Sequence, residues 1–585
     1  MREDGQHQQG LKGILKTRPV STSNSLSPSP KPLTASSPLQ SSQHIKLPPI
    51  DTMPDQLLST VPANSTSGRA PAMLRKHSSP MMPPFMVSAP GKVIVYGEHA
   101  VVHGKPAIAA AISLRSYLHV SFLSKSHRTV TMRFPDIELE HTWELDTLPW
   151  DAFSAPGKKK FYYDLVTSLD PDLLAAIEPS IQEVSPKAPE SIRKIHHSTA
   201  CCFLYLFCSL ASRKTPPCVY TLRSTIPLRA GLGSSASISV CISAALLLQI
   251  RALSGPHQDQ PPQECELQIE RINRWAFVGE MCIHGNPSGI DNTVAAGGKA
   301  VLYQRQGPGK PSRIVPIHSF PELPLLLVNT RQSRSTSVEV AKVATLKENH
   351  PALTENILNS IGLVTESAYK LLTSPDFDPS SPESLKHLGD LVTINHGLLV
   401  ALGVSHPKLE RIRELIDHTG IGWTKLTGAG GGGCAITIIK PRPTSISNGN
   451  GVHPDHSSSD EASDSDAESP KAAASVISSG TKLKHRILDN LEVKLGNEGF
   501  DKFETTLAGD GVGVLWPAVL HNVNEEEGGE EIDQEKFLRA EGTEGIERLV
   551  GVASARARAR KLDALRDVRE GWKFWRPWET EANED

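Results

Sequence analysis

The stretch that decides the fold reads Ile226-Pro227-Leu228-Arg229-Ala230-Gly231-Leu232-Gly233-Ser234-Ser235-Ala236. A strand-like run at 219–223 precedes it, and apolar residues with helical spacing follow it: Ile238, Cys241, Ile242, Ala245 and Leu246. The spacing predicts a helix that begins at about Ser234. A glycine-rich loop entering a helix presents backbone N–H groups and the positive end of the helix dipole, which suits a polyphosphate. We therefore expect phosphate binding here, with the Ser235 hydroxyl turned toward a phosphate-bound Mg²⁺; a plain helix cap after a tight turn is the alternative.

The same stretch also fits the dinucleotide pattern G-x-G-x-x-A, which would indicate an oxidoreductase. That pattern needs a second strand ending in Asp or Glu about 20 residues later. Here the helix runs into the segment 253–261, and no strand precedes Asp259. This absence weakens the dinucleotide hypothesis, and no Walker A sequence occurs in the chain.

A second glycine-rich segment covers residues 428–433 and is followed by the strand-like run 434–439. A dinucleotide site would need a helix at that point. The pattern instead predicts a glycine hairpin or loop whose backbone approaches a ligand, with 425–427 leading into it. A purely structural turn rarely needs five glycines in six positions.

Three charged residues in other segments are candidates for the chemistry of a site. Lys92 opens an apolar strand, where its ammonium group would need an anionic partner, although such a residue is more often a solvated strand end. Glu280 lies at the edge of a helical stripe, and the turn that follows returns Asp291 toward that helix. Two carboxylates in one cleft can serve as a Mg²⁺ ligand and a general base, but each alone is more often a surface or turn residue.

Composition divides the 585 residues into folded and unfolded parts. Ser and Pro supply 25 of the first 80 residues, too little apolar content for a core. We expect a disordered extension over 1–84, with a transit peptide as an alternative. Globular sequence follows from about Phe85, interrupted by a low-complexity insert at 441–481. The charge-rich tail 519–585 suits a solvated helix, and its Trp572, Trp575 and Trp578 would dock either on a partner or on the protein itself.

Charge and cysteine content exclude several classes of protein. With 61 Lys and Arg against 64 Asp and Glu, the chain has no field of one sign for binding nucleic acid along its length. The eight cysteines form no C-x-x-C pair, which disfavours a disulfide scaffold or zinc ribbon and favours a reducing compartment. Apolar stretches are too short to span a bilayer. We expect a cytoplasmic protein.

Taken together and in this order, four segments resemble the motifs of the GHMP kinases, and their details are most similar to the mevalonate kinase family. They are residues 89–102, 226–236, 284–292 and 425–434. The resemblance covers about 85–440 and, more weakly, 482–516. It implies a two-domain α+β fold with an ATP-binding N-terminal domain at 85–321 and a ferredoxin-like C-terminal domain at 322–518.

The resemblance also implies a reaction and the residues for it. The expected reaction transfers the γ-phosphoryl group of ATP to the C5 hydroxyl of mevalonate, toward isoprenoids and sterols. Asp291 corresponds to the general base and Lys92 to the lysine that stabilises developing charge, while Glu280 and Ser235 correspond to the Mg²⁺ ligands. The residues expected to contact ATP are Lys92, Ser224, Ala230, Gly231, Leu232, Gly233, Ser234 and Ser235. Those expected to face mevalonate are His99, Thr427 and Gly428.

One position departs from the family pattern. Arg229 stands where members usually carry Gly, which adds a cation to the phosphate loop and reduces its freedom. Another GHMP kinase such as phosphomevalonate kinase, or a catalytically inactive sensor on the same fold, remains an alternative. The joint presence of Lys92, Ser235, Glu280 and Asp291 argues against the sensor. The family is commonly dimeric and is inhibited by prenyl diphosphates, so the resemblance implies a homodimer and such feedback.

Overall fold

The computed structural model describes residues 82–440, 470–521, 529–552 and 571–577, except positions 229, 258, 308, 309, 311 and 334. In 470–482 only the backbone is described. The chain divides into two units, Met1–Lys76 and His77–Asp585, and every element below belongs to the second. The extension predicted for 1–84 lies almost wholly outside the described residues, as does 441–469 of the predicted insert.

Two long antiparallel strands, β1 (Phe85–Tyr96) and β2 (Ala107–Phe122), form the middle of the sheet. Both are near-continuous apolar runs, as expected for strands that are buried on both faces. A 3-10 turn, η1 (Ala100–His103), connects them. On the N-terminal side the sheet continues with β3 (Thr129–Phe134), β4 (Leu139–Glu144), β5 (Cys218–Ser224), β6 (Ala300–Gln304) and β7 (Arg313–Ile317).

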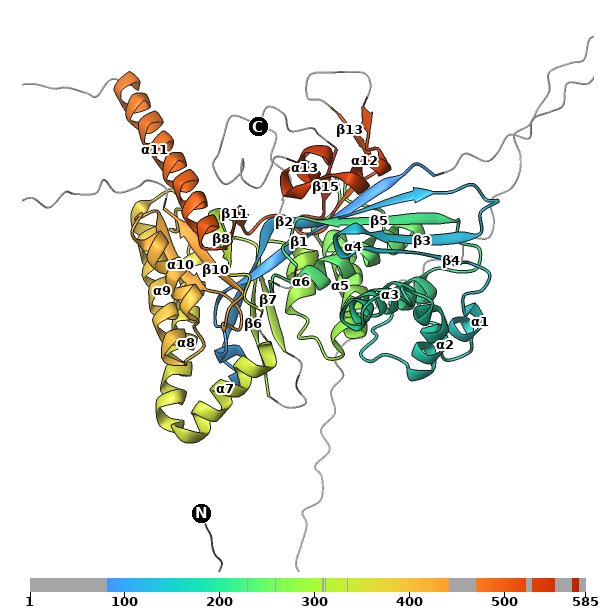
Figure 1. The fold of residues 1–585 in the computed structure, drawn as a ribbon, viewed down its shortest axis with the longest axis horizontal. Coiled ribbons are helices and arrows are strands. Elements are labelled where there is room, and N and C mark those ends of the chain that lie inside the picture. Colours follow the sequence, from blue (N-terminus) through green and yellow to red (C-terminus); the bar gives the residue numbers. More distant parts are fainter. Residues whose placement is uncertain are drawn as a thin grey trace, which may run out of the picture. The chain divides into compact units, whose positions relative to one another are not determined.

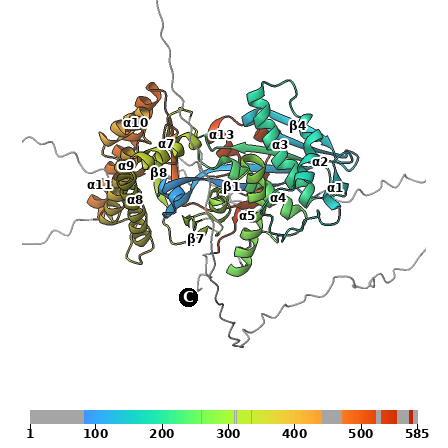
Figure 2. The ribbon, with the colours of Figure 1, turned by 90° about the horizontal axis from the view of Figure 1, so that it is seen from below.

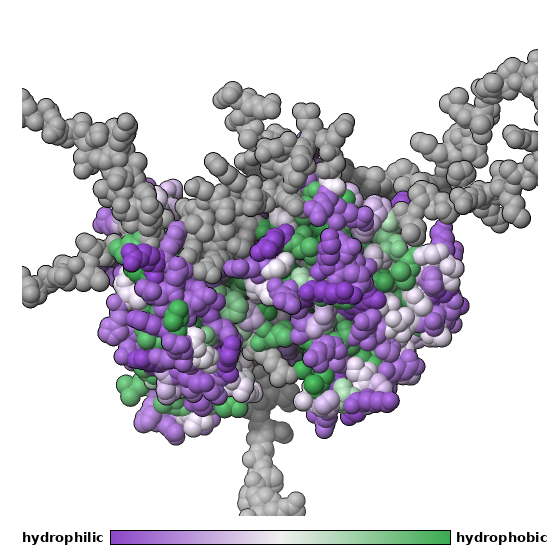
Figure 3. Space-filling model, turned by 45° about the horizontal axis from the view of Figure 1, so that its top comes forward, coloured by the Kyte–Doolittle hydropathy of each residue, from purple (hydrophilic) through white to green (hydrophobic). Residues whose placement is uncertain are grey.

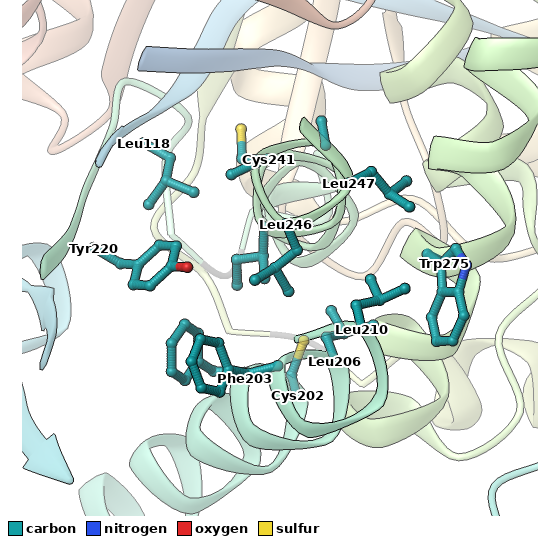
Figure 4. Packing of buried hydrophobic residues seen from close by; sticks show 14 of the residues in the cluster. Leu118, Cys202, Phe203, Leu206, Leu210, Tyr220, Cys241, Leu246, Leu247 and Trp275 are labelled. Carbon is teal, nitrogen blue, oxygen red and sulfur yellow. The ribbon is translucent and has the colours of Figure 1, made fainter. Parts of the chain in front are cut away.

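A helical layer packs beneath this part of the sheet (Figures 1 and 2). Its members are α3 (Glu190–Leu210), α4 (Ser234–Gln249), α5 (Pro262–His284) and α6 (Ile290–Gly297), with α1 (Trp150–Ser154), α2 (Pro171–Gln182) and the short turn η2 (Pro135–Ile137) beside them. The helix predicted to begin at about Ser234 is α4, so that prediction is confirmed. Figure 4 shows Leu246 and Leu247 of α4 among side chains of α3 and α5. A helix apolar on all sides is buried on all sides, which fixes the position of its N-terminus.

The C-terminal half has four antiparallel strands in the spatial order β11-β8-β10-β9. Their bounds are β8 (Leu323–Asn329), β9 (Gly422–Leu426), β10 (Cys434–Ile439) and β11 (Asp501–Leu507). The helices that accompany them are α7 (Thr336–Asn349), α8 (Pro351–Leu372), α9 (Pro382–Ala401), α10 (Pro407–Asp417) and α11 (Pro470–Asn497). In chain order this is a β-α-β-β-α-β unit with spatial order 4-1-3-2, which is the ferredoxin-like arrangement. The predicted α+β fold is confirmed.

The start of α11 differs from the expectation. The sequence placed the end of the insert at 481 and the start of helical spacing at Leu483, whereas the helix begins at Pro470. Pro is favoured in the first turn of a helix. Residues 472–474 are all alanine, the residue type with the highest helix propensity. Low-complexity composition concealed these two local signals.

The segment expected to be a charged, solvated tail contains ordered elements that pack on the protein itself. They are β13 (Val519–Leu520), β14 (Glu530–Glu531), α12 (Gln534–Arg539), α13 (Gly542–Leu549) and β15 (Lys573–Phe574), next to β12 (Gly513–Leu515). β15 pairs with β12, which pairs with β1. Trp575 is fully buried, so of the two alternatives for the tryptophans it docks on this chain. Trp578 lies outside the described residues.

The face in Figure 3 is mostly hydrophilic, with hydrophobic residues scattered over it. Among the residues that the structure describes, no helix is both long and apolar enough to cross a membrane.

Candidate active site

A cavity of about 690 Å³ lies where β1, the loop before α4 and the glycine loop between β9 and β10 approach one another. Helices α3, α5, α6 and α7 complete its wall. Its lining combines polar and charged groups with apolar side chains, among them Ile195, Leu228, Ile238, Ile242 and Ile283. The volume suits a small-molecule ligand of nucleotide size.

The phosphate loop predicted from the sequence lines this cavity. Gly231 and Gly233 have φ of +78° and +72°, and Gly233 caps the N-terminus of α4. A Cβ atom at Gly233 would also lie 3.0 Å from Lys92 Cγ, so a side chain there would be strained in its backbone and would press on Lys92. The Lys92 N–H donates to Leu232 O at 2.8 Å, which ties the loop to β1. The first N–H groups of a helix have no partner within it, and Gly233, Ser234 and Ser235 at the start of α4 line the cavity.

Lys92 and Asp291 form an ion pair at the cavity wall, with Nζ 3.1 Å from Oδ1. Lys92 projects from β1, just after an irregularity in its pairing with β2. Asp291 stands in the first turn of α6, where the helix dipole favours a carboxylate. The lysine side chain is 9% exposed and the aspartate 32%, so the pair is sheltered yet open to a ligand on the Asp291 side. The anionic partner expected for Lys92 is therefore present.

Glu280 is buried behind this pair, near the C-terminal end of α5. Burial, and then the charge of Asp291, raise the pKa of its carboxyl to about 8, against the opposing effects of Ser235 and Lys92. Its Oε1 has no hydrogen-bond partner among the described residues, and neither does Ser234 Oγ. Ser235 Oγ lies 3.0 Å from His284 Nε2. A buried carboxyl oxygen left without a partner, on a side chain beside a second carboxylate, is an environment that a cation would stabilise.

These donors fit Mg²⁺ bound together with phosphate oxygens. In the part of the chain that the structure describes, no three His, Cys, Asp or Glu side chains form a metal cluster. Mg²⁺ in phosphoryl-transfer sites is commonly held by one or two protein groups, with phosphates and water completing its coordination. Glu280 and Ser235 would supply the protein groups.

The residues expected to face the acceptor substrate have different surroundings. His99 lines the cavity, and its Nε2 lies 2.8 Å from Ala429 O. Gly428 also lines the cavity, whereas Thr427 is not among the lining residues and its Oγ1 donates to Ile94 O at 2.8 Å. The predicted glycine hairpin is present between β9 and β10.

Two more predicted residues need separate mention. Ser224 ends β5 and is not among the lining residues of the cavity; its Oγ accepts a hydrogen bond from the Ile226 N–H at 3.2 Å. Arg229, whose charge sets this phosphate loop apart, lies outside the described residues.

Sequence reasoning missed a buried ion pair between Glu98, which is among the residues that line the cavity, and Lys425. Glu98 and Lys425 have fully buried side chains and pair with each other, and Asn395 Nδ2 donates to Glu98 Oε2 at 2.9 Å. Burial lowers the pKa of Lys425, and Glu98 opposes that shift. Glu98 lies in the motif segment 89–102 and Lys425 in the segment 425–434, but 327 positions separate the two residues. Thr336 and Val340 at the start of α7 also line the cavity without any signal in the sequence.

Comparison with known proteins agrees with this fold. Residues 199–298 match the GHMP kinases N terminal domain and residues 381–448 match GHMP kinases C terminal. The phosphate loop, the paired charges and the ferredoxin-like half thus belong to a GHMP kinase.

The similar proteins narrow this class further. Mevalonate kinase erg12 of Aspergillus fumigatus is 60% identical over 513 residues, covering 88% of this chain and 86% of its own. Mevalonate kinase ERG12 of Gibberella zeae is also 60% identical, covering 87% of this chain and 91% of its own. A crystal structure of L. major mevalonate kinase in complex with R-mevalonate aligns with 72% of this chain and 96% of its own, at 22% identity and a TM-score of 0.47. The chain belongs to the mevalonate kinase family.

Proposed function

We propose that this chain transfers the γ-phosphoryl group of ATP to the C5 hydroxyl of mevalonate. The observation that carries the proposal is the Lys92–Asp291 ion pair at the wall of a cavity that the phosphate loop also lines. A base beside a cation is what a hydroxyl nucleophile needs, because the hydroxyl must lose a proton as it attacks. The two close relatives named above supply the choice of acceptor.

In this proposal Asp291 accepts the C5 hydroxyl proton. Its carboxylate is about one third exposed on the cavity side, so the hydroxyl can reach it. Lys92 is held from two directions, by its own N–H bond to Leu232 O and by its ion pair with Asp291. Its ammonium group is therefore fixed where negative charge develops on the attacking oxygen. Such fixed charges and positioning account for most of the catalysis of phosphoryl transfer.

The phosphate end of the site belongs to α4 and α5. We assign Ala230 to Ser235 to the triphosphate, because their backbone lies at the helix N-terminus that opens into the cavity. Ser235 and Glu280 would hold Mg²⁺, which when bound neutralises phosphate charge and orients the γ-phosphoryl group. Ser224 keeps its assignment as an ATP contact only as a prediction, since it lies away from the cavity wall.

The acceptor end belongs to His99, Thr427 and Gly428. His99 and Gly428 line the cavity. Thr427 would help to position Ile94, a lining residue whose carbonyl oxygen accepts a hydrogen bond from the Thr427 hydroxyl. The His99 imidazole lies against Ala429 O, and this contact joins the two loops. This region would orient mevalonate so that its C5 hydroxyl meets Asp291.

Further features of the protein follow from family membership and are proposals of the same kind. We propose a cytoplasmic homodimer that prenyl diphosphates inhibit; the apolar lining residues Ile195, Ile238 and Ile242 support an apolar ligand group in this cavity. We also keep the domain boundary at 321/322 as a proposal. β8 begins at Leu323, although one sheet continues through both halves.

A coupled ADP-release assay on the purified chain tests the proposed function. Mevalonate, phosphomevalonate, homoserine and galactose are offered separately, each with Mg·ATP. We expect turnover with mevalonate alone. Turnover with phosphomevalonate alone would move the assignment to a sister enzyme, and no turnover with any acceptor would favour an inactive sensor.

A further inference from the structure

The residues 571–577, here called the C-terminal strap, contact α5, which carries Glu280, and the Asp510 loop beside α6, which carries Asp291. Lys573 and Phe574 pair with Val514 and Gly513 of β12 in antiparallel register. The strap then leaves the sheet edge and inserts Trp575, which is 0% exposed, into the N-terminal core. A chain segment that buries a whole indole is part of the fold and not an appendage.

Trp575 is linked to two helices of the helical layer. Its indole Nε1 donates to Gln268 Oε1 at 3.1 Å, and Gln268 belongs to α5, the helix of Glu280. Its backbone N–H donates to Val512 O at 3.4 Å, and the Val512 N–H bonds to Ala296 of α6, the helix of Asp291. Trp575 therefore contacts α5 directly and is linked to α6 through Val512.

The next strap residue holds a loop that supports the C-terminal end of α6. Arg576 forms two hydrogen bonds to the Asp510 carboxylate, at 2.8 and 2.9 Å. The loop that contains Asp510 bonds to α6 and its exit at Ala296 and Lys299: the Val512 N–H donates to Ala296 O at 3.0 Å, and the Lys299 N–H donates to Gly509 O at 2.9 Å. Bidentate pairs of this kind fix geometry as well as adding energy.

The backbone of this loop packs directly against the C-terminal end of α6. A Cβ atom at Gly511 would lie 2.3 Å from Ala296 O, and one at Gly298 would lie 2.2 Å from Gly511 N. A displacement of the loop therefore displaces the helix. Ala296 is five residues from Asp291, which at 1.5 Å per residue is about 7.5 Å along the axis.

We propose that the C-terminal strap positions the general base, with Trp575 and Arg576 as positioning residues that hold α6, and hence Asp291, against Lys92. This inference rests on the proposed function for its kinetic consequence. A misplacement of a catalytic group by about 1 Å can cost on the order of 10²-fold in rate. The phosphate loop at the nucleotide end is tied to β1 by the Lys92 N–H bond to Leu232 O, and Glu280 is 12 residues, about 18 Å along the axis of α5, from the strap's partner Gln268. We therefore expect the nucleotide end to depend little on the strap.

The strap itself offers a matched control. Trp572 is in the same segment, but its Nε1 donates to Val550 O, its ring packs against Tyr117 and stacks on Phe574, and none of these contacts is with α5 or α6. We expect Trp575→Leu to lower kcat by at least tenfold with KM for ATP within twofold of wild type, and Trp572→Leu to keep kcat within twofold. An equal loss of kcat in both variants would overturn the proposal, because it would reflect general destabilisation.

Arg576→Gln provides a test if Trp575→Leu does not fold, since Arg576 is about one third exposed. We expect Arg576→Gln and Asp510→Asn each to lower kcat about threefold to tenfold, with the double variant no worse than either, because both remove one interaction. Unchanged kcat in both, or additive losses, would overturn the role of this pair.

A readout independent of activity separates this proposal from the proposed function. Hydrogen exchange followed by mass spectrometry reports the protection of amides in 290–297. We expect faster exchange there in Trp575→Leu and Arg576→Gln, and wild-type exchange in α4 at 234–249. Wild-type exchange in 290–297 would overturn the strap's hold on α6 whether or not the enzyme turns over mevalonate, whereas failure of wild-type turnover would refute only the proposed function.

Discussion

Replacing Glu280 by Gln in the metal-free protein should remove a pH dependence of stability that this one carboxyl creates. Its pKa is raised to about 8 by burial and by the nearby charge of Asp291, from an ordinary value of 4.5. Between these two values the folded protein keeps the proton and the unfolded chain has lost it. The unfolded state then binds fewer protons, so the free energy of unfolding falls as pH rises.

The size of the effect follows from the shift. Each pH unit between 4.5 and about 8 lowers the free energy of unfolding by about 1.4 kcal/mol. From pH 6.0 to 7.5 the wild-type protein should therefore lose about 2 kcal/mol through Glu280. Glu280→Gln is neutral in both states and should lose none of it.

Urea unfolding in the presence of EDTA measures this difference. Wild type and Glu280→Gln are compared at pH 6.0 and 7.5, so that contributions of other groups cancel in the difference. Glu264→Gln on the same helix is the control, because Glu264 is fully exposed and hydrogen bonds from Gln260 and Ser254 lower its pKa. We expect Glu264→Gln to retain the wild-type pH dependence.

Equal pH dependence in wild type and Glu280→Gln would refute the reasoning. The same substitution is expected to impair the use of nucleotide. Glu280→Gln should raise KM for Mg·ATP, with partial rescue at higher Mg²⁺, because a metal ligand is lost while the base remains. If Glu280 serves to bind a cation, its replacement should remove the loss of stability at higher pH and at the same time weaken the binding of Mg·ATP.

Two further predictions concern other parts of the chain. Deletion of 1–80, and separately of 443–469, should leave kcat within about twofold of wild type, because every described residue of the site lies outside both segments; steady-state assays decide, and loss of folded protein would contradict the reasoning. Lys425→Met should lower the free energy of unfolding by about 3–5 kcal/mol by leaving Glu98 charged and buried, and urea titration should show partial recovery on adding Glu98→Gln. No recovery in the double variant would mean that packing, and not charge, explains the loss.

Local chemistry made most of the candidate site predictable. The helix start at Ser234 follows from 3.6-residue spacing after a glycine loop. The need of Lys92 for an anionic partner follows from its place at a buried strand end, whereas the structure identifies that partner as Asp291. The hairpin at 428–433 follows from glycine content before a strand-like run. Each inference needed only residues within about 20 positions of one another, or an obvious charge requirement.

The features that were missed depend on contacts between distant segments. The Glu98–Lys425 pair joins residues 327 positions apart, and nothing near either one indicates burial. Trp575 follows a highly charged segment, and its core position becomes visible only when β15 is seen to pair with β12. Composition describes only the average character of 519–585, and it does not reveal the few buried apolar residues such as Phe537, Ile546 and Trp575.

The most direct test of the central claim is the kcat of Asp291→Asn with mevalonate and Mg·ATP. The variant keeps size and turn propensity but cannot accept the hydroxyl proton, so kcat should fall by roughly 10²–10⁴-fold with KM for ATP little changed. Asp172→Asn, in the first turn of α2 and remote from the cavity, is the matched control and should keep wild-type kcat. If Asp291→Asn retained more than about a tenth of wild-type kcat, general-base catalysis by Asp291 would be contradicted.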